Sequence, residues 1–351
     1  MDKNNLIRDS FSPLISVIIP IYNNTPFDIR RCIDSILMQR FESYEVIMVD
    51  DGSRKDCADF IDEIANKRHN FIVIHQSNQG VSVARNVGVN SASGEFIIFV
   101  DADDLITPQF FLDVYYITNQ YSVDIIYGFV KYIKNNNRFA NLNNSTEKLI
   151  IEYLDISMKC ALYQYMIDYS VDYFRDKDLY VNLGPVAKVI RREIAKKNLF
   201  NNNLSYGEDA IWNLNLLSRA SDLEIIYAKR LWYLYTENLD SVTHKYVDNT
   251  IKKCERFLLV LWQYSNSERF KINFLNRELQ VIGQIWHAHF LTKKRKKTID
   301  ELNLTQLVKT EPWNFAFKWR YAVHLNKKSL FKFLLLKLGI LSFVYRFKNI
   351  F

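Results

Sequence analysis

Four short apolar runs, separated by stretches with helical spacing, occupy the first third of the chain. They read ISVIIP (15–20), YEVIMVDD (44–51), FIVIHQ (71–76) and EFIIFVDAD (95–103). Nearly continuous runs of Ile, Val and Phe that alternate with helices are typical of parallel strands buried on both faces of a sheet. The chain is therefore predicted to be an α/β protein with a Rossmann-like, mostly parallel sheet flanked by helices.

Each predicted strand ends in a cluster of polar residues. The clusters are residues 20–23, 50–53, 76–78 and 101–104. Ligands of open α/β sheets bind beyond the carboxyl ends of the strands, which is where these clusters meet. The sequence therefore predicts a ligand site at this edge of the sheet.

The acidic sequence Asp101-Ala102-Asp103 follows the last of these runs. On an extended backbone, side chains at positions i and i+2 point to the same side, so both carboxylates project together. Paired carboxylates at a strand end suit Mg²⁺ or Mn²⁺ bound to a diphosphate. A DxD sequence alone is more often a solvated loop, but the buried run before it and the tight turn that Gly94 permits favour a site.

Two further clusters have both a functional and a structural interpretation. Asp51 either accepts a hydrogen bond from a nucleobase or ribose, or belongs to a turn before a helix, and Ser53 is expected to cap that helix in either case. Arg85 and Asn86, in a helix that begins after Gly80, either bind a phosphate or nucleoside, or lie on an exposed amphipathic helix. The residues alone leave these alternatives open.

A third acidic pair, Glu208-Asp209, opens a later helical pattern. Acidic residues in the first turn of a helix are stabilised by the helix dipole, which is the structural explanation. The functional explanation makes Asp209 a general base that takes the proton of an acceptor hydroxyl.

Taken in order, four motifs resemble the family 2 glycosyltransferases with the GT-A fold. They are ISVIIPIYNN, YEVIMVDDGS, NQGVSVARNVGVNSASGEFIIFVDADD and GEDAIWNLNLL, and the similarity spans about residues 13–240. The resemblance implies an inverting enzyme that moves a sugar from a nucleotide-sugar to an acceptor hydroxyl in one displacement. It also implies a UDP-sugar donor and a divalent cofactor, Mn²⁺ or Mg²⁺.

The same resemblance implies roles for individual residues. Asp209 matches the catalytic base, Asp103 the residue that coordinates the metal, and Asp51 the aspartate that reads uracil. Asp101 matches the first acid of the DxD, near the ribose, and is a further candidate metal ligand. The residues implied in nucleotide-sugar binding are Pro20, Tyr22, Asn23, Asp50, Asp51, Asn78, Arg85, Asp101 and Ala102.

Two other residues have weaker support. Lys188 resembles the family's lysine in the acceptor half, but Val186-Ala187 stands where the family often has Trp-Gly, so its role is open. His244 is a candidate metal ligand, although a lone histidine is more often a packed or surface residue.

The middle of the chain has fewer clear elements. Strands are expected at 124–133, 223–228 and 231–235, and the Asn-rich segment 135–145 is expected to be a loop. The predicted organisation is a short extension over 1–12, a GT-A domain over 13–245 and a helical region over 246–351. Within the GT-A domain, 13–130 is expected to bind the nucleotide-sugar and 131–245 the acceptor.

The last 61 residues are strongly basic. Residues 291–351 contain fourteen Lys and Arg against three acidic residues, a net +11, whereas the remaining 290 residues carry a net −4. Basic residues interleaved with Trp, Phe and Leu indicate a helical region on an anionic membrane surface. Nucleic-acid binding is disfavoured, while packing on the catalytic domain remains an alternative. The resemblance to the family implies that the acceptor is a glycan, lipid-linked in cell-surface polysaccharide synthesis.

The cysteines and the chain start indicate a cytoplasmic protein, and the basic C-terminal region predicts that it is peripheral at the inner face of the membrane. The four cysteines form no CxxC pair, and the first ten residues contain no apolar run. The longest apolar stretches near the end are interrupted by Lys332, Lys337 and Arg346, which disfavours a membrane span.

Other classes of protein fit less well. A nucleotidyltransferase needs a phosphate loop rich in Gly, Lys or Arg after the first strand, and residues 21–24 read IYNN instead. A dinucleotide oxidoreductase is disfavoured because none of the nine glycines forms GxGxxG. A non-catalytic nucleotide-sugar-binding or membrane-associated scaffold stays open as the alternative.

Overall fold

The computed structural model describes residues 12–134, 148–170, 174–176, 179–237, 249–291 and 304–338. The chain forms two compact units that are each discontinuous in sequence. The first comprises Met1–Cys160, Phe174–Asn203 and Asn215–Glu237, and the second Ala161–Tyr173, Leu204–Leu214 and Asn238–Phe351. The division at 245/246 stays a prediction, because residues 238–248 lie outside the described part, as do the Asn-rich segment 135–145 and His244.

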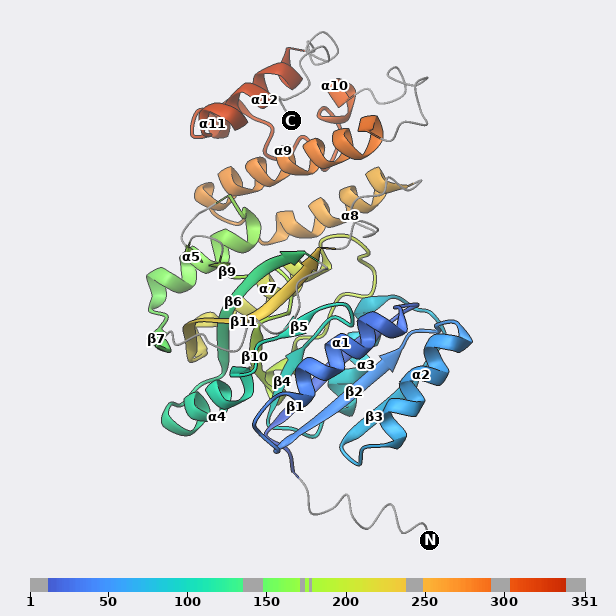
Figure 1. Ribbon diagram of the computed structural model, residues 1–351. Helices are drawn as coiled ribbons and strands as arrows, with labels where there is room; N and C mark the ends of the chain where they lie inside the picture. The colour runs from blue at the N-terminus through green and yellow to red at the C-terminus, as the bar shows by residue number, and fades with distance from the viewer. Residues whose placement is uncertain are drawn as a thin grey trace. The chain divides into compact units, whose positions relative to one another are not determined.

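The first four apolar runs form parallel strands in the first unit (Figure 1). The strand order is β3-β2-β1-β4, with Ile18 of β1 opposite Ile47 of β2 and Phe99 of β4. The side chains of β2 are all buried, as expected for a strand covered on both faces. The bounds are β1 Ile15–Ile21, β2 Tyr44–Asp50, β3 Phe71–His75 and β4 Phe96–Phe99.

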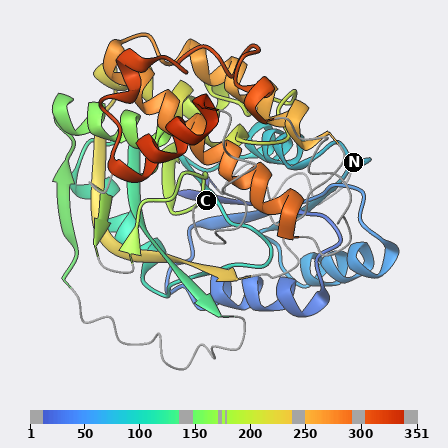
Figure 2. The same cartoon turned by 90° about the horizontal axis from the view of Figure 1, so that it is seen from above.

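Helices cover both faces of these strands. The apolar side chains of α1 (Pro26–Leu37) and α2 (Lys55–Asn66) pack with Val17 and Ile19 of β1 on one face, where Figures 1 and 2 show the two helices side by side. Helix α3 (Val81–Ser91) lies on the other face. It approaches β1 so closely that a Cβ at its Gly88 would stand 2.3 Å from Ile18, so only glycine fits there.

The remaining strands make the sheet mixed. Strand β10 (Lys188–Arg191) lies antiparallel between β4 and β6 (Ile125–Lys134), and the long strand β11 (Ile225–Glu237) is parallel to β6. The predicted α/β class is confirmed, and its parallel part is the first four strands. The shorter elements of this unit are β5 Leu105–Ile106, β7 Ile150–Tyr153, β8 Arg175–Asp176, β9 Leu179–Tyr180, α4 Phe110–Gln120, α6 Arg192–Lys197 and the 3₁₀ turn Ala220–Asp222.

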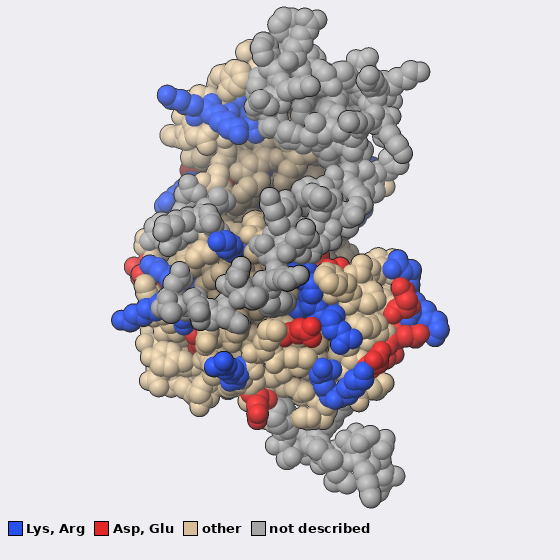
Figure 3. Space-filling view, in the orientation of Figure 1, with Lys and Arg blue, Asp and Glu red and all other residues tan. Residues whose placement is uncertain are grey.

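The charged surface of the first unit mixes both signs. Figure 3 shows Lys and Arg beside Asp and Glu over much of the described part of its visible face. On α2, for example, Lys55 pairs with Asp59 and Lys67 with Glu63, each one turn apart. Such exposed pairs stabilise a helix only slightly.

The second unit is helical in its described part. Helix α9 (Glu268–Leu291) packs against α8 (Thr250–Gln263), α11 (Trp319–Ala322) and α12 (Lys327–Lys337). Fully buried Phe257, Phe274, Leu275, Trp313 and Phe333 supply its core. The unit also contains α10 (Leu304–Leu307), the second part of α5 (Ile156–Ile167) and the first part of α7 (Glu208–Leu217). Among the described residues, no helix is both long and apolar enough to cross a lipid bilayer.

Candidate active site

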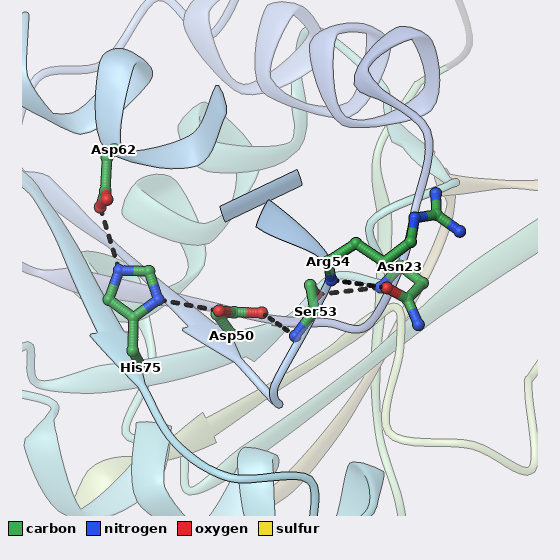
Figure 4. Close-up of polar contacts among 6 residues, drawn as sticks. All are labelled: Asn23, Asp50, Ser53, Arg54, Asp62 and His75. Carbon is green, nitrogen blue, oxygen red and sulfur yellow. Dashed lines mark hydrogen bonds and ion pairs between the residues drawn. The ribbon is translucent and has the colours of Figure 1, made fainter. Parts of the chain in front are cut away.

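Hydrogen bonds tie the loops after β1 and β2 together (Figure 4). The Asp50 carboxylate accepts the backbone N–H of Ser53 at 2.9 Å and lies 2.8 Å from Nδ1 of His75. The Ser53 hydroxyl accepts the backbone N–H of Asn23 at 3.0 Å, and Asn23 Oδ1 accepts the backbone N–H of Arg54 at 2.8 Å. The prediction that Ser53 caps α2 is wrong, because Arg54 is the N-cap residue and the Ser53 hydroxyl binds the neighbouring loop. Asn23 has a φ of 55°, a left-handed conformation that asparagine tolerates better than most residues. The loop is therefore held in one shape.

Asp51 ties the end of β2 to the turn before α3. Its carboxylate accepts hydrogen bonds from Gln76 Nε2 at 2.7 Å and from the backbone N–H groups of Gln79 and Gly80, both at 2.8 Å. An ionised carboxylate has about four acceptor positions, so these three bonds leave one. The buried Asp51 thus shapes the site, and its predicted contact with uracil would use the remaining position.

The electrostatics of the Asp50–His75 contact favour charge on both groups. Burial alone would raise the pKa of Asp50, but hydrogen bonds from Ser53 and His75 outweigh it and hold that pKa below its ordinary value. The pKa of His75 is raised, chiefly by the hydrogen bond to Asp50, which together with Asp62 outweighs the opposing effect of partial burial.

Arg85 pairs with the first acid of the DxD sequence. Its Nη2 lies 3.0 Å from Oδ1 of Asp101, its side chain is buried, and its guanidinium stacks 5.3 Å from the centre of the Phe200 ring. Arg85 therefore fixes Asp101 in place, and its predicted phosphate contact stays a prediction. Asn86, next along α3, exchanges hydrogen bonds with the backbone of Phe200 and so has a packing role.

The acidic turn 101–104 is anchored to β11 by its last residue. Asp104 is 1% exposed, and its carboxylate accepts the Tyr233 hydroxyl and the backbone N–H of Thr236, both at 2.7 Å. The Tyr233 oxygen in turn accepts the backbone N–H of Asp101 at 3.1 Å. Asp101 and Asp103 stay partly exposed, while Ala102 and Asp104 are buried. The backbone here is a turn, closed by a hydrogen bond of 3.0 Å from the Asp104 N–H to the Asp101 carbonyl oxygen, and is not the extended backbone that the sequence predicted.

The turn fits a small hard cation held jointly with a ligand. Mg²⁺ commonly takes only one or two protein carboxylates and completes its shell with phosphate oxygens and water. Asp101 and Asp103 supply such a set. Within the described ranges, no group of three or more His, Cys, Asp or Glu forms a complete metal cage.

Lys188 lies in the middle of the sheet, at the start of β10. It is 1% exposed, donates from Nζ to the carbonyl oxygens of Asn182 (2.7 Å) and Gly184, and lies over the Tyr127 ring. The lysine therefore stabilises the loop at 182–184.

Asp209 belongs to the second unit and lies in the first turn of α7. Gly207, just before the helix, has a φ of 70°, and a Cβ there would stand 2.3 Å from Phe257, so glycine is required. Asp209 is partly exposed, and its backbone carbonyl accepts the side chain of Asn213 at 3.1 Å. Its role as the base stays a prediction from the motif.

Three residues that shape the first unit's polar loops were not among the predicted site residues. Asp104 is adjacent to the DxD sequence, and its neighbours could have marked it. His75 and Tyr233 carried no signal, because Tyr233 meets Asp104 across 129 residues and His75 meets Asp50 across 25.

Solved structures show the same fold. The structure of S. aureus TarS residues 1–349 in complex with UDP is similar with a TM-score of 0.58 at 20% identity, over 93% of this chain and 87% of that one. The complex of the same segment with UDP-GlcNAc is similar with a TM-score of 0.57. The first unit therefore has the GT-A-type α/β fold that the sequence predicted.

Residues 16–199, more than half of the chain, match the family described as Glycosyl transferase family 2, and the chain belongs to it. The chain is 29% identical over 233 residues to the uncharacterized glycosyltransferase EpsJ of Bacillus subtilis, covering 66% of this chain and 63% of EpsJ. It is 26% identical to the poly(ribitol-phosphate) beta-glucosyltransferase of Bacillus spizizenii, covering 66% of this chain and 34% of that protein. The chain thus spans less than two thirds of these relatives. The predicted family is confirmed.

Proposed function

We propose that this protein is an inverting glycosyltransferase that moves a sugar from a nucleotide-sugar, with UDP as the nucleotide, to an acceptor hydroxyl. The observation that carries this proposal is the acidic turn 101–104, in which Tyr233 holds the Asp101 backbone and the Asp104 carboxylate. Arg85 pairs with the Asp101 carboxylate, and Asp101 and Asp103 stay partly exposed. Family membership supports it, as does the fold shared with TarS, which was solved with UDP and with UDP-GlcNAc.

The proposed reaction is a single displacement. The acceptor oxygen bonds to the anomeric carbon while the bond from that carbon to the diphosphate oxygen breaks, and the nucleoside diphosphate leaves with the electron pair. Asp209 takes the acceptor proton. Asp103 and Asp101 would hold Mn²⁺ or Mg²⁺, which when bound offsets the negative charge on the departing diphosphate. Pro20, Tyr22, Asn23 and the loop held by Asp50 and Asp51 would receive the nucleoside.

A screen of nucleotide-sugars tests this function. The full chain is incubated with UDP-, GDP- and dTDP-sugars in Mn²⁺ or Mg²⁺, and free nucleotide is measured with and without a polyol-phosphate or glycan acceptor. We expect release of UDP from one UDP-sugar, and loss of that release in excess EDTA. Nucleotide-sugar binding without any release would instead favour the non-catalytic scaffold.

We further propose that the acceptor is a glycan, lipid-linked in cell-surface polysaccharide synthesis, and that the second unit binds the inner face of the membrane. The support is a surface with apolar and basic side chains on α11, α12 and the adjoining residues. Trp319, Val323 and Phe331 are 51%, 65% and 47% exposed, and Lys327 and Lys328, which lie between Val323 and Phe331 in the sequence, are exposed too. From Pro312 to the last residue the sequence has no Asp or Glu. Such a surface suits anionic lipid.

Vesicle flotation tests the membrane proposal. We expect the full chain to float with vesicles containing anionic phospholipid at low salt, and to bind roughly tenfold less after a double substitution, Trp319→Ala with Phe331→Ala. Replacing Tyr115 and Tyr116 of α4, which are also about half exposed, is the matched control and should leave binding unchanged. Equal binding by all three proteins, or none by the wild type, would refute the membrane surface.

A further inference from the structure

His75, at the end of β3, lies between two carboxylates (Figure 4). Its Nδ1 is 2.8 Å from Oδ2 of Asp50 on β2, and its Nε2 is 3.1 Å from Oδ1 of Asp62 on α2. The Asp50 side chain is 4% exposed, whereas the imidazole and the Asp62 side chain are 45% and 47% exposed. The ring thus joins the buried carboxylate of Asp50, at the end of β2, to the partly exposed carboxylate of Asp62 on α2.

The number of hydrogen bonds that the ring can donate depends on its protonation. An ionised carboxylate only accepts hydrogen bonds, and a neutral imidazole has a single N–H to donate. Both ring nitrogens therefore donate at once only when His75 carries a proton on each. A neutral ring keeps one of the two bonds and leaves the other nitrogen facing a carboxylate oxygen with no hydrogen between them.

The Asp50 side of the ring leads directly into the predicted nucleoside pocket. Asp50 holds the Ser53 backbone, and the Ser53 hydroxyl holds the backbone of Asn23. Asn23 and the 54% exposed Tyr22 beside it are residues predicted to line that pocket. A change in the Asp50–His75 contact therefore passes to the loop through two hydrogen bonds.

We propose that His75 is a positioning residue for the donor nucleotide, and that its doubly protonated form holds the Asp50–Ser53–Asn23 loop in the shape that binds the nucleotide. This inference rests on the proposed function of the site. Binding is then tighter at mildly acidic pH than at alkaline pH.

The charged groups around the His75 ring favour its protonated form, which is consistent with tighter nucleotide binding at lower pH. The His75 ring contacts Asp50 on β2 and Asp62 on α2. Cys57 of α2 lies near Asp50, and Arg54 and Asp56 pair with each other at the surface. The pKa of His75 is raised, chiefly by Asp50. Because the pKa of His75 is raised in the folded protein, the stabilisation of the loop by the protonated ring is complete below about pH 6.5, the ordinary histidine pKa. This stabilisation is lost as the pH rises through the higher pKa that His75 has in the folded protein.

Two variants and two measurements test the inference. We expect the His75 ring, followed by NMR and assigned by its absence in His75→Asn, to titrate above the ordinary histidine value. The Kd for UDP with Mn²⁺ should weaken roughly three- to tenfold between about pH 6 and pH 8.5 in the wild type, the range of one net hydrogen bond. In His75→Asn, which keeps a donor toward Asp50 but cannot titrate, the Kd should not follow this pH step.

Asp62→Asn is the matched variant on the other side of the ring. Its amide can donate to a neutral imidazole, so the ring should titrate at lower pH, and the step in Kd should move with it. His69→Asn alters an exposed histidine in the turn that follows α2, three residues after the helix ends at Asn66. This variant leaves the carboxylate pair intact and should keep the wild-type profile.

The failures can be told apart. A His75 titration at or below the ordinary value, or a UDP profile that is the same in wild type and His75→Asn, would overturn the role of His75 alone. Absence of UDP binding by the wild type at every pH would overturn the proposed nucleotide site, and the role of His75 with it.

Discussion

Replacing Asp209 with asparagine should lower the rate of sugar transfer by about 10²- to 10⁴-fold, the range that a positioned general base contributes. The amide keeps the shape of the side chain but cannot take the acceptor proton. Donor binding does not use that proton, so the Kd for UDP should stay close to the wild-type value. Transfer is measured as nucleotide release in the presence of acceptor, and Kd by titration calorimetry.

Glu208→Gln is the control for this experiment, because it removes a neighbouring charge from the same helical turn. It should reduce transfer far less than Asp209→Asn. Equal losses in both variants, or parallel losses of transfer and of UDP binding in Asp209→Asn, would show that Asp209 serves the fold of α7 instead of the chemistry.

Replacing Asp103 with asparagine should reduce transfer by about 10²- to 10³-fold, the usual cost of losing one group that stabilises developing charge. The physical reason is the loss of a carboxylate ligand for the divalent cation, so activity should also require much more Mn²⁺. The measurement is a Mn²⁺ titration of transfer at fixed donor concentration.

Asp59→Asn supplies the matched loss of charge for this second prediction, since Asp59 lies exposed on α2 in the same unit. Its Mn²⁺ curve should overlay that of the wild type. If the curve of Asp103→Asn overlays it too, Asp103 is not a ligand of the cation.

The sequence was sufficient to predict the strands and helices whose pattern of apolar residues is visible within a short stretch of the chain. The apolar runs at 15–20, 44–51 and 71–76 form β1, β2 and β3, and the helix predicted to begin after Gly80 is α3, which starts at Val81. Burial on both faces demands continuous apolar residues, and that demand is visible in a short window.

Elements that depend on distant partners were harder to predict. Strand β10 was not expected, because its four residues gain their partners from β4 and β6 far earlier in the chain. The strands expected at 223–228 and 231–235 are one strand, β11, whose register against β6 shifts between Tyr227 and Tyr233. A bulge of this kind interrupts the alternation of side chains, which made one strand look like two.

The same limit applies to the site. The polar clusters at the strand ends could be read from the sequence, but the donors that surround each side chain could not. The three hydrogen bonds to Asp51 and the stacking of Arg85 on Phe200 come from residues up to 115 positions away.

The hydroxyl of Tyr233 has a consequence for how this protein can be divided. A fragment that stops at residue 130 would contain every acidic residue of the turn, yet it would lack the phenol that holds both the Asp104 carboxylate and the Asp101 amide. The segment predicted to bind the donor is therefore not self-sufficient. Its geometry is completed by a strand more than a hundred residues later, so any minimal protein made for crystallography or engineering must extend through β11.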